Sequence, residues 1–197
     1  LEQLMPFSDL LDQIDAGSSK PIIIDRDVVP ALLELTSQDK IYYVASDLDI
    51  EVSFGHFKRF RERSTPYAEP AWVTEVRYSK ELNTCWKRFV CCKELMHAFD
   101  YEDELANTGE KFRRLLSELE LRPPTPSRML LSEHRALWRA MAVLAPARLI
   151  APLEDDYKSG TLNDYEVALS LRIPEFYVPH IFDEIFPEIV GVLRNGG

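Results

Sequence analysis

The apolar positions of the chain repeat with two different periods. Short runs rich in isoleucine, valine and tyrosine, and runs that alternate between apolar and polar residues, predict strands. We predict these strands at Pro21–Ile24, Ile41–Ala45, Ile50–Phe54 and Trp72–Tyr78. Apolar residues that recur every three or four positions predict helices. We predict helices at Pro6–Ala16, Val28–Leu35, Cys85–Phe99, Thr108–Leu121, Glu133–Leu144, Leu162–Leu171 and from Pro174 toward Leu193.

The order of these elements predicts an α+β fold, with a small N-terminal sheet followed by a helical half. Small polar residues at helix starts are expected as caps, namely Ser8 or Asp9, Thr84 and Ser132. A length of 197 residues with 46% hydrophobic residues suits one domain with its own core. Within this domain we distinguish a mixed α/β part (1–80), a middle pair of helices (81–150) and a C-terminal helical part (151–197).

The net charge of −10 disfavours binding to nucleic acid or to an anionic membrane, whose phosphates would repel the chain. No apolar run approaches the roughly 18 residues of a membrane span, and the start of the chain does not resemble a signal peptide. The chain begins with Leu1 rather than methionine, so the sequence leaves open whether residues precede it.

The three cysteines lie close together, and their number is odd. Cys91 and Cys92 are adjacent and would form only a strained bridge, so we expect both to be buried as small apolar residues. This cysteine usage predicts a reducing, cytoplasmic setting. The segment Phe57–Arg63 mixes basic and aromatic residues, and we expect it to be a solvated or partner-binding loop. The region Leu162–Phe182 is too poor in arginine to predict DNA binding.

The segment Arg88–Asp100, RFVCCKELMHAFD, differs by one residue from HExxH, the helical motif of zinc peptidases. In that motif two histidines one turn apart hold zinc, and the glutamate polarises the attacking water. Glu94 and His97 stand at the glutamate and second-histidine positions, whereas Lys93 replaces the first histidine. A protonated lysine has no lone pair to offer a metal. A glutamate and a histidine at this spacing also occur in ordinary helices, so His97 as a hydrogen-bonded core histidine remains the alternative.

The surrounding residues extend the motif. Val76-Arg77-Tyr78 precedes Lys87-Arg88-Phe89 and KELMH, and a later segment carries Glu133, Ala136, Ala140, Val143-Leu144 and Pro146. In this order and spacing the stretch from Trp72 to Pro146 resembles the ImmA/IrrE family of zincin-like metallopeptidases. The C-terminal part fits that family only loosely.

The resemblance implies a zincin-like fold and a role for each matching position. Glu94 falls on the catalytic base, His97 on a metal ligand and Glu133 on the third metal ligand. Two positions depart from the family, since Lys93 stands at the first ligand and Arg139 at a usual aromatic.

Two neighbours are candidate replacement ligands, because Asp100 lies one turn beyond His97 and His134 adjoins Glu133. Neither restores the spacing of the motif. The resemblance implies zinc as the cofactor, but the lysine predicts that none is bound tightly. We expect Lys93 instead to form a buried ion-pair network with Glu94 and Glu133.

Two functions follow from the resemblance. The first is a metal-impaired pseudo-peptidase that serves as a protein-interaction or regulatory module. The alternative is an active zinc metalloendopeptidase that cleaves a regulatory protein. The family implies phage, mobile-element or stress regulation and a protein partner such as a transcriptional regulator. The acidic charge of the chain predicts no direct contact with nucleic acid or membrane. Catalysis requires a polarised water, and Lys93 argues against the ion that would polarise it, so the sequence favours the pseudo-peptidase.

Overall fold

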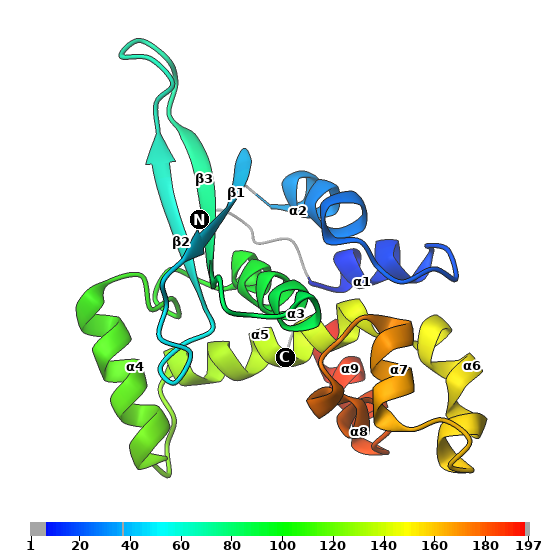
Figure 1. Ribbon diagram of the computed structural model, residues 1–197. Helices are drawn as coiled ribbons and strands as arrows, with labels where there is room; N and C mark the ends of the chain where they lie inside the picture. The colour runs from blue at the N-terminus through cyan, green and yellow to red at the C-terminus, as the bar shows by residue number, and fades with distance from the viewer. Residues whose placement is uncertain (1–6, 37, 196–197) are drawn as a thin grey trace.

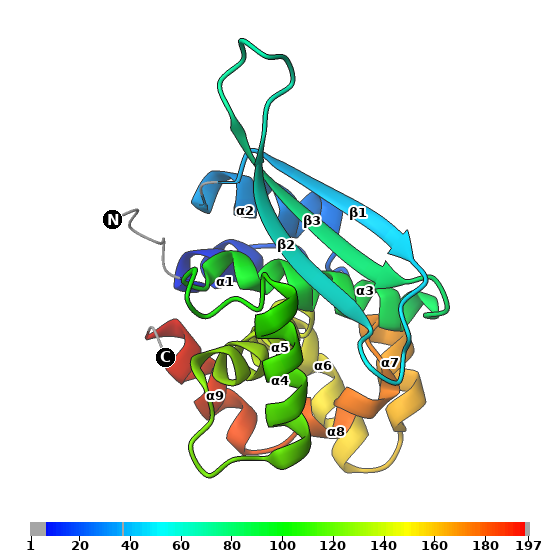
Figure 2. The ribbon, with the colours of Figure 1, turned by 90° about the vertical axis from the view of Figure 1, so that its left-hand side faces the viewer.

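The computed structural model describes residues 7–36 and 38–195 as a mixed α+β protein with a small sheet and a helical C-terminal half (Figure 1). The sheet has three strands in the order β1 (Lys40–Ser46), β3 (Ala71–Ser79) and β2 (Gly55–Glu62). β1 is parallel to the central β3, and β2 is antiparallel to it. β2 and β3 form a long hairpin whose tip extends away from the rest of the molecule (Figures 1 and 2).

The inner face of the sheet covers α3 (Thr84–Leu95), which lies between the sheet and α5 (Arg128–Leu144) (Figure 1). Val76 of the central strand is fully buried on this face. Ile41 and Tyr43 of the neighbouring parallel strand β1 lie on the same face of the sheet and also pack against the core. α3 runs directly into a 3-10 turn, η2 (Met96–Phe99), which changes the direction of the chain. The sheet, α3 and α5 therefore form three successive layers.

The remaining helices surround α5 and α3. They are α1 (Phe7–Asp15), the π-helical turn η1 (Ile24–Val28), α2 (Val29–Leu35), α4 (Gly109–Leu121), α6 (Ala147–Lys158), α7 (Asp164–Leu171), η3 (Glu175–Tyr177), α8 (Val178–Ile181) and α9 (Ile185–Arg194). α1 and α9, from opposite ends of the described chain, are in contact, and Arg194 forms ion pairs with Asp12 and Asp15. Leu10, Leu32, Leu95 and Leu144 are fully buried in one continuous core. α4 contributes to a separate small cluster through Leu115.

Two strand predictions are wrong. Pro21–Ile23 is extended but pairs with no strand among the described residues, and the chain turns into η1 because the Asp27 carboxylate accepts the Ile23 N–H at 2.7 Å. Ile50–Phe54 is a turn, and the strand begins only at Gly55. The expected loop Phe57–Arg63 is in fact most of β2, as the pairing of Phe57 with Val76 shows.

Several helix boundaries also need correction. Asn83, rather than Thr84, caps α3 by accepting the Trp86 N–H at 3.0 Å. α5 begins one full turn before the predicted start, with Ser127 as its cap, so Ser132 lies inside the helix. The sequence analysis predicted no helix after Pro146, where α6 begins. Pro146 stands at the N-cap position of α6, and Pro152 lies within the helix. Pro6, the predicted start of the first helix, lies outside the described residues.

The predicted strands Ile41–Ala45 and Trp72–Tyr78 are confirmed as β1 and β3, and the helix expected at Thr108–Leu121 is confirmed as α4 with Thr108 as its cap. In the described part of the chain, no single helix is long and apolar enough to cross a membrane. Only the pair α5 and α6, taken together across a bend of 80°, meets that criterion of length and composition.

Candidate functional site

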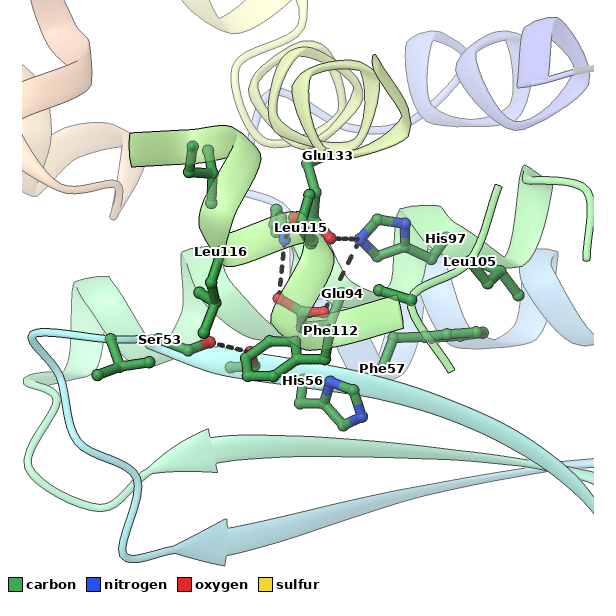
Figure 3. Close-up of a pocket in the computed structure, with 15 residues that line it drawn as sticks. Ser53, His56, Phe57, Glu94, His97, Leu105, Phe112, Leu115, Leu116 and Glu133 are labelled. Atoms are coloured by element: carbon green, nitrogen blue, oxygen red, sulfur yellow. Dashed lines mark hydrogen bonds and ion pairs between the residues drawn. The ribbon is translucent and has the colours of Figure 1, made fainter. Parts of the chain in front are cut away.

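Lys93 of α3 and Glu133 of α5 form an ion pair where the two helices meet. Figure 3 shows Glu133 directed toward Glu94 and His97. The Lys93 Nζ donates to Glu94 Oε1 at 3.0 Å and also to Glu133 Oε2. Glu94 comes from the same helix turn as Lys93, whereas Glu133 comes from α5, forty residues later. The ammonium therefore lies between two carboxylates and joins the two helices.

His97 closes the opposite side of this group. Its Nε2 lies 3.4 Å from Glu133 Oε1 and 3.9 Å from Glu94 Oε2 (Figure 3). The imidazole is only 4% exposed, and the ring of Phe57 on β2 covers it at a centroid distance of 5.7 Å. Lys93 and His97 thus alternate with Glu94 and Glu133 in a closed ring of four polar side chains.

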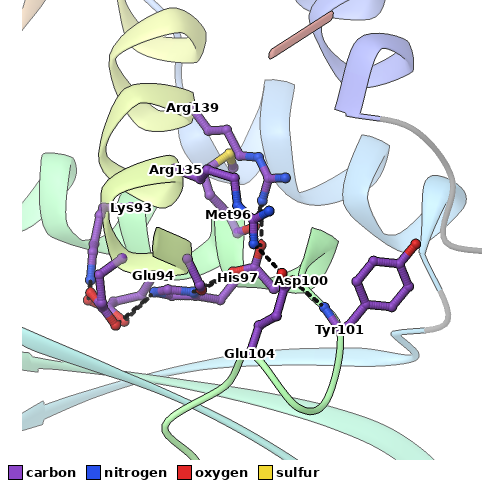
Figure 4. Close-up of polar contacts among 11 residues, drawn as sticks. Lys93, Glu94, Met96, His97, Asp100, Tyr101, Glu104, Arg135 and Arg139 are labelled. Atoms are coloured by element: carbon purple, nitrogen blue, oxygen red, sulfur yellow. Dashed lines mark hydrogen bonds and ion pairs between the residues drawn. The ribbon is translucent and has the colours of Figure 1, made fainter. Parts of the chain in front are cut away.

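Asp100 holds the other nitrogen of His97. Its Oδ2 lies 2.8 Å from His97 Nδ1 and accepts the Ser132 hydroxyl at 2.5 Å. Its Oδ1 accepts Arg139 Nη1 at 2.6 Å (Figure 4). The Asp100 side chain is fully buried, so every contact it makes is with protein groups of the interior. This arrangement fixes the ring plane of His97 and directs its Nε2 toward Glu133.

The network continues from Asp100 to a second acidic residue. Arg135 Nη2 pairs with Glu104 Oε1 at 2.6 Å and lies 3.8 Å from Asp100 Oδ1. Glu104 also accepts the Tyr101 backbone N–H at 3.0 Å (Figure 4). Arginine and carboxylate groups alternate along this branch, as lysine, histidine and glutamate do around the first ring. The charges of the whole network therefore compensate one another without an added ion when His97 is protonated.

The surroundings shift the pKa values of four groups of this network toward their charged forms. Burial alone would lower the pKa of Lys93 and of His97, but the adjacent carboxylates outweigh it, and both pKa values are raised. Burial would raise the pKa of Asp100 and of Glu133. For Asp100 the contacts with His97 and Arg139 outweigh burial, and for Glu133 the charges of Lys93 and His97 do so, so both pKa values are lowered. The electrostatics therefore stabilise the charged forms of these four groups.

A cavity of about 80 Å³ opens beside the first ring of charges (Figure 3). Lys93 and Glu133 reach this space with 19% and 26% of their side chains exposed, whereas Glu94 is 5% exposed. The opposite wall comes from α4, through Phe112 and Leu119. Gly55, His56 and Phe57 of β2 line a further side. The polar groups are therefore accessible only from a small space with largely apolar walls.

A zinc ion does not fit the donor set of this site. The Lys93 ammonium has three N–H donors and no lone pair, and it already occupies the space between Glu94 and Glu133. Only His97 and Glu133 remain as ligands at the family's positions, whereas catalytic zinc sites use three protein ligands. Among the described residues no group of three or more histidine, cysteine, aspartate or glutamate side chains is arranged to hold a metal ion.

The structure brings Lys93, Glu94, His97 and Glu133 together, but not the two proposed replacement ligands. His134 is exposed on α5 and is not among the residues that line the cavity. Asp100 contacts the Nδ1 side of His97, away from Glu133. The roles of Ser132 and Arg139 as partners of Asp100 were not predicted from the sequence. For Arg139 a signal was present, because an arginine on an apolar helix face indicates that a carboxylate lies opposite.

Comparisons with protein-family models, with curated proteins and with solved structures found no match to this chain.

Proposed function

We propose that this protein is an ImmA/IrrE-like zincin-fold pseudo-peptidase that works as a protein-interaction or regulatory module. The observation that carries the proposal is the position of the Lys93 ammonium between Glu94 and Glu133. In a zinc peptidase a metal ion supplies the positive charge between such groups and polarises water. An ammonium supplies the charge, but it has no coordination position at which water could be activated.

The lysine also prevents the glutamate from acting as a base. A general base must accept a proton from water, and it must be within hydrogen-bond reach of that water. Glu94 already accepts a hydrogen bond from Lys93, and its side chain is 5% exposed. The ion-pair network thus holds the two helices together. It takes the place of the metal ion, and it occupies the glutamate that peptide hydrolysis would require as a base.

The surface around the cavity supports a protein-binding role. Val52 and Leu119, on opposite walls, are 51% and 46% exposed. β2 is an edge strand of the described sheet, and its first residues line the cavity. Exposed apolar side chains beside an unpaired strand edge are features that bind an extended segment of another protein. The partner of this module is a protein, in the proposal a transcriptional regulator.

Zinc binding by the parent protein and by a Lys93→His variant tests the proposal. Protein purified without chelator is expected to contain far less than one equivalent of zinc. Lys93→His restores HELMH with Glu133 as the third ligand, and its melting temperature is expected to rise with zinc. Lys93→Ser is the matched control, since it removes the same ammonium without adding a ligand. The stabilisation expected for Lys93→His is about 2.7 kcal/mol when free zinc is a hundredfold above its dissociation constant.

Two results would contradict the proposal. One is stoichiometric zinc in the parent protein after extensive dialysis. The other is peptidase activity of the parent that Glu94→Gln abolishes. Either result would favour the alternative, a zinc metalloendopeptidase that cleaves a regulatory protein. If zinc stabilises neither Lys93→His nor Lys93→Ser, Glu133 does not stand at the position of a third zinc ligand.

A further inference from the structure

α3 has a second face that borders a larger cavity. Lys93, Glu94 and His97 belong to the ring of charges on one side, whereas Thr84, Lys87, Arg88 and Cys91 recur at helical spacing on another side. These four line a cavity of about 390 Å³ together with the segment 22–25, the sheet and the end of α7. The volume lies within the range of small-molecule sites.

The lining of this second cavity is positively charged although the protein is acidic. Three cations, Lys87, Arg88 and Arg172, surround it, and Asp25 is the only acidic residue in its lining. In the part of the chain that the structure describes, no carboxylate lies within 4.0 Å of any of these three cations. In a chain of net charge −10, most cations could find an acidic neighbour. Three cations without one at a single cavity indicate a place for an anion.

Arg88 is a fixed positive charge beside this cavity. Its guanidinium donates only to backbone carbonyls, those of Ile22 at 2.6 Å, Leu171 at 3.1 Å and Arg172. These bonds join three distant segments, but they leave the positive charge without an ionic partner. Burial accordingly lowers the pKa of Arg88. An anion in the cavity would supply the charge compensation that the three carbonyl groups do not.

The Tyr43 hydroxyl on the cavity wall is a hydrogen-bond donor. It is buried and makes no well-formed hydrogen bond among the described residues, although the Asp25 carboxylate lies beside it and interacts with it weakly. Burial raises the pKa of Tyr43, and the nearby Asp25 carboxylate raises it further, so the phenol stays protonated and remains a donor. A buried hydroxyl without a well-formed hydrogen bond is destabilising, which favours a ligand oxygen at this position. The rings of Tyr43 and Tyr78 and the side chains of Ile22 and Ile24 supply apolar walls.

We infer that this second cavity binds a small organic anion, a carboxylate or phosphate group on a compact apolar body. Lys87 and Arg172 are exposed at the rim of the cavity, where the Lys87 ammonium lies 4.5 Å from the centre of the Tyr78 ring, whereas Arg88 contributes a fixed charge. The Tyr43 hydroxyl donates to an oxygen of the ligand, and the apolar body lies against the isoleucine and tyrosine side chains. Asp25 also lies beside Tyr43, and the three cations outweigh its repulsion of the anionic group. The site lies apart from the ring of Lys93 and does not depend on the proposed function.

Calorimetric titration with benzoate, and separately with inorganic phosphate, tests the inference. Benzamide, which has the shape of benzoate without its charge, is the ligand control. Lys87→Gln and Arg172→Asn are each expected to weaken binding by about tenfold, the usual effect of losing one charged hydrogen bond. Asparagine suits position 172 because that residue has φ 57°. Lys158→Gln, which removes an exposed cation on α6, is expected to leave the affinity unchanged.

Tyr43→Phe provides an independent measurement. It is expected to weaken benzoate binding without lowering the melting temperature of the unliganded protein, because the hydroxyl makes no well-formed hydrogen bond there. Binding of benzoate rather than phosphate would identify a carboxylate ligand, and the reverse a phosphate ester. The inference is wrong if neither anion binds at millimolar concentration. It is also wrong if benzamide binds as well as benzoate, or if Lys87→Gln and Arg172→Asn behave like Lys158→Gln.

Discussion

Gly55 on β2 lies so close to Val90 on α3 that a Cβ atom at position 55 would stand 2.4 Å from Val90 Cγ1. The same atom would lie 3.1 Å from the carbonyl oxygen of Arg77 and 3.1 Å from Glu94 Cγ. A separation of 2.4 Å is well below van der Waals contact, so no side chain fits while the strand and the helix keep their positions. The absence of a side chain at position 55 thus sets how closely β2 approaches the helix that carries Glu94.

Gly55→Ala is expected to lower the free energy of unfolding by about 1–3 kcal/mol, because the added methyl group overpacks the contact between strand and helix. Denaturant unfolding measures the change. Gly109→Ala at the start of α4 is the control, since a Cβ there meets no atom within 4 Å. Adding Val90→Ala to Gly55→Ala should recover part of the loss. Equal stability of Gly55→Ala and Gly109→Ala would contradict the close packing.

Lys93→Met is expected to destabilise the protein by about 3 kcal/mol, the lower end of the range for breaking a buried pair. The lower end applies because the Lys93 and Glu133 side chains remain 19% and 26% exposed. The loss arises from two carboxylates left without their shared cation, so Glu133→Gln in the same chain should reduce it. Lys80→Met, which removes an exposed pair with Asp47, should leave the unfolding midpoint unchanged.

Stability should fall toward both acid and alkaline pH because of Asp100 and His97. The folded pKa of Asp100 is lowered from 3.8, so its contribution is complete above that value and is lost as pH falls through the folded pKa. The folded pKa of His97 is raised from 6.5, so its contribution is complete below that value and is lost as pH rises through the folded pKa. Unfolding free energies across this range measure both slopes. Asp100→Asn should flatten the acid side, and an unchanged acid slope would count against its ionised state in the fold.

Thiol reactivity should separate the three cysteines. Burial raises the pKa of Cys91 and of Cys92 to about 12, and the two are 5% and 0% exposed. Cys85 is partly exposed near the start of α3. A thiol reagent at neutral pH should therefore modify one cysteine in the native protein and three after unfolding. Replacing Cys85 with serine should abolish the native reaction; rapid modification of Cys92 in the folded protein would show that the core is not closed.

The sequence predicted most helices and two strands because their apolar periods match the faces that are buried. β2 escaped prediction because Arg59 and Arg61 lie on its inner face, where charged residues are unexpected. The structure explains their position, since their guanidinium groups stack on the ring of Trp72 at 4.3 Å and 4.6 Å. Conversely, the isoleucines at 22–24 suggested a strand, although Ile22 and Ile24 are buried beside η1 without strand pairing. Tertiary contacts outweighed local propensity in both segments.

The candidate site was predictable in its main members but not in their supports. A motif spacing places Glu94 and His97 on one helix, and Glu133 was expected only from the resemblance of the later segment to a known family. Nothing in local spacing connects Asp100 to Ser132 or to Arg139, which lie 32 and 39 residues away. These partners depend on how α5 crosses α3, which a single sequence does not specify.

The pairing of Arg194 with Asp12 and Asp15 has a consequence for how the chain is made. The ribosome synthesises α1 before α9, with about 180 residues between the paired side chains. At a rate of about 5–20 residues per second, this interval lasts roughly 10–40 s. Throughout that time the part of α1 that contacts α9 lacks this neighbour. The nascent protein therefore carries α1 only partly packed until α9 has been made, and the contact between the two helices forms only then.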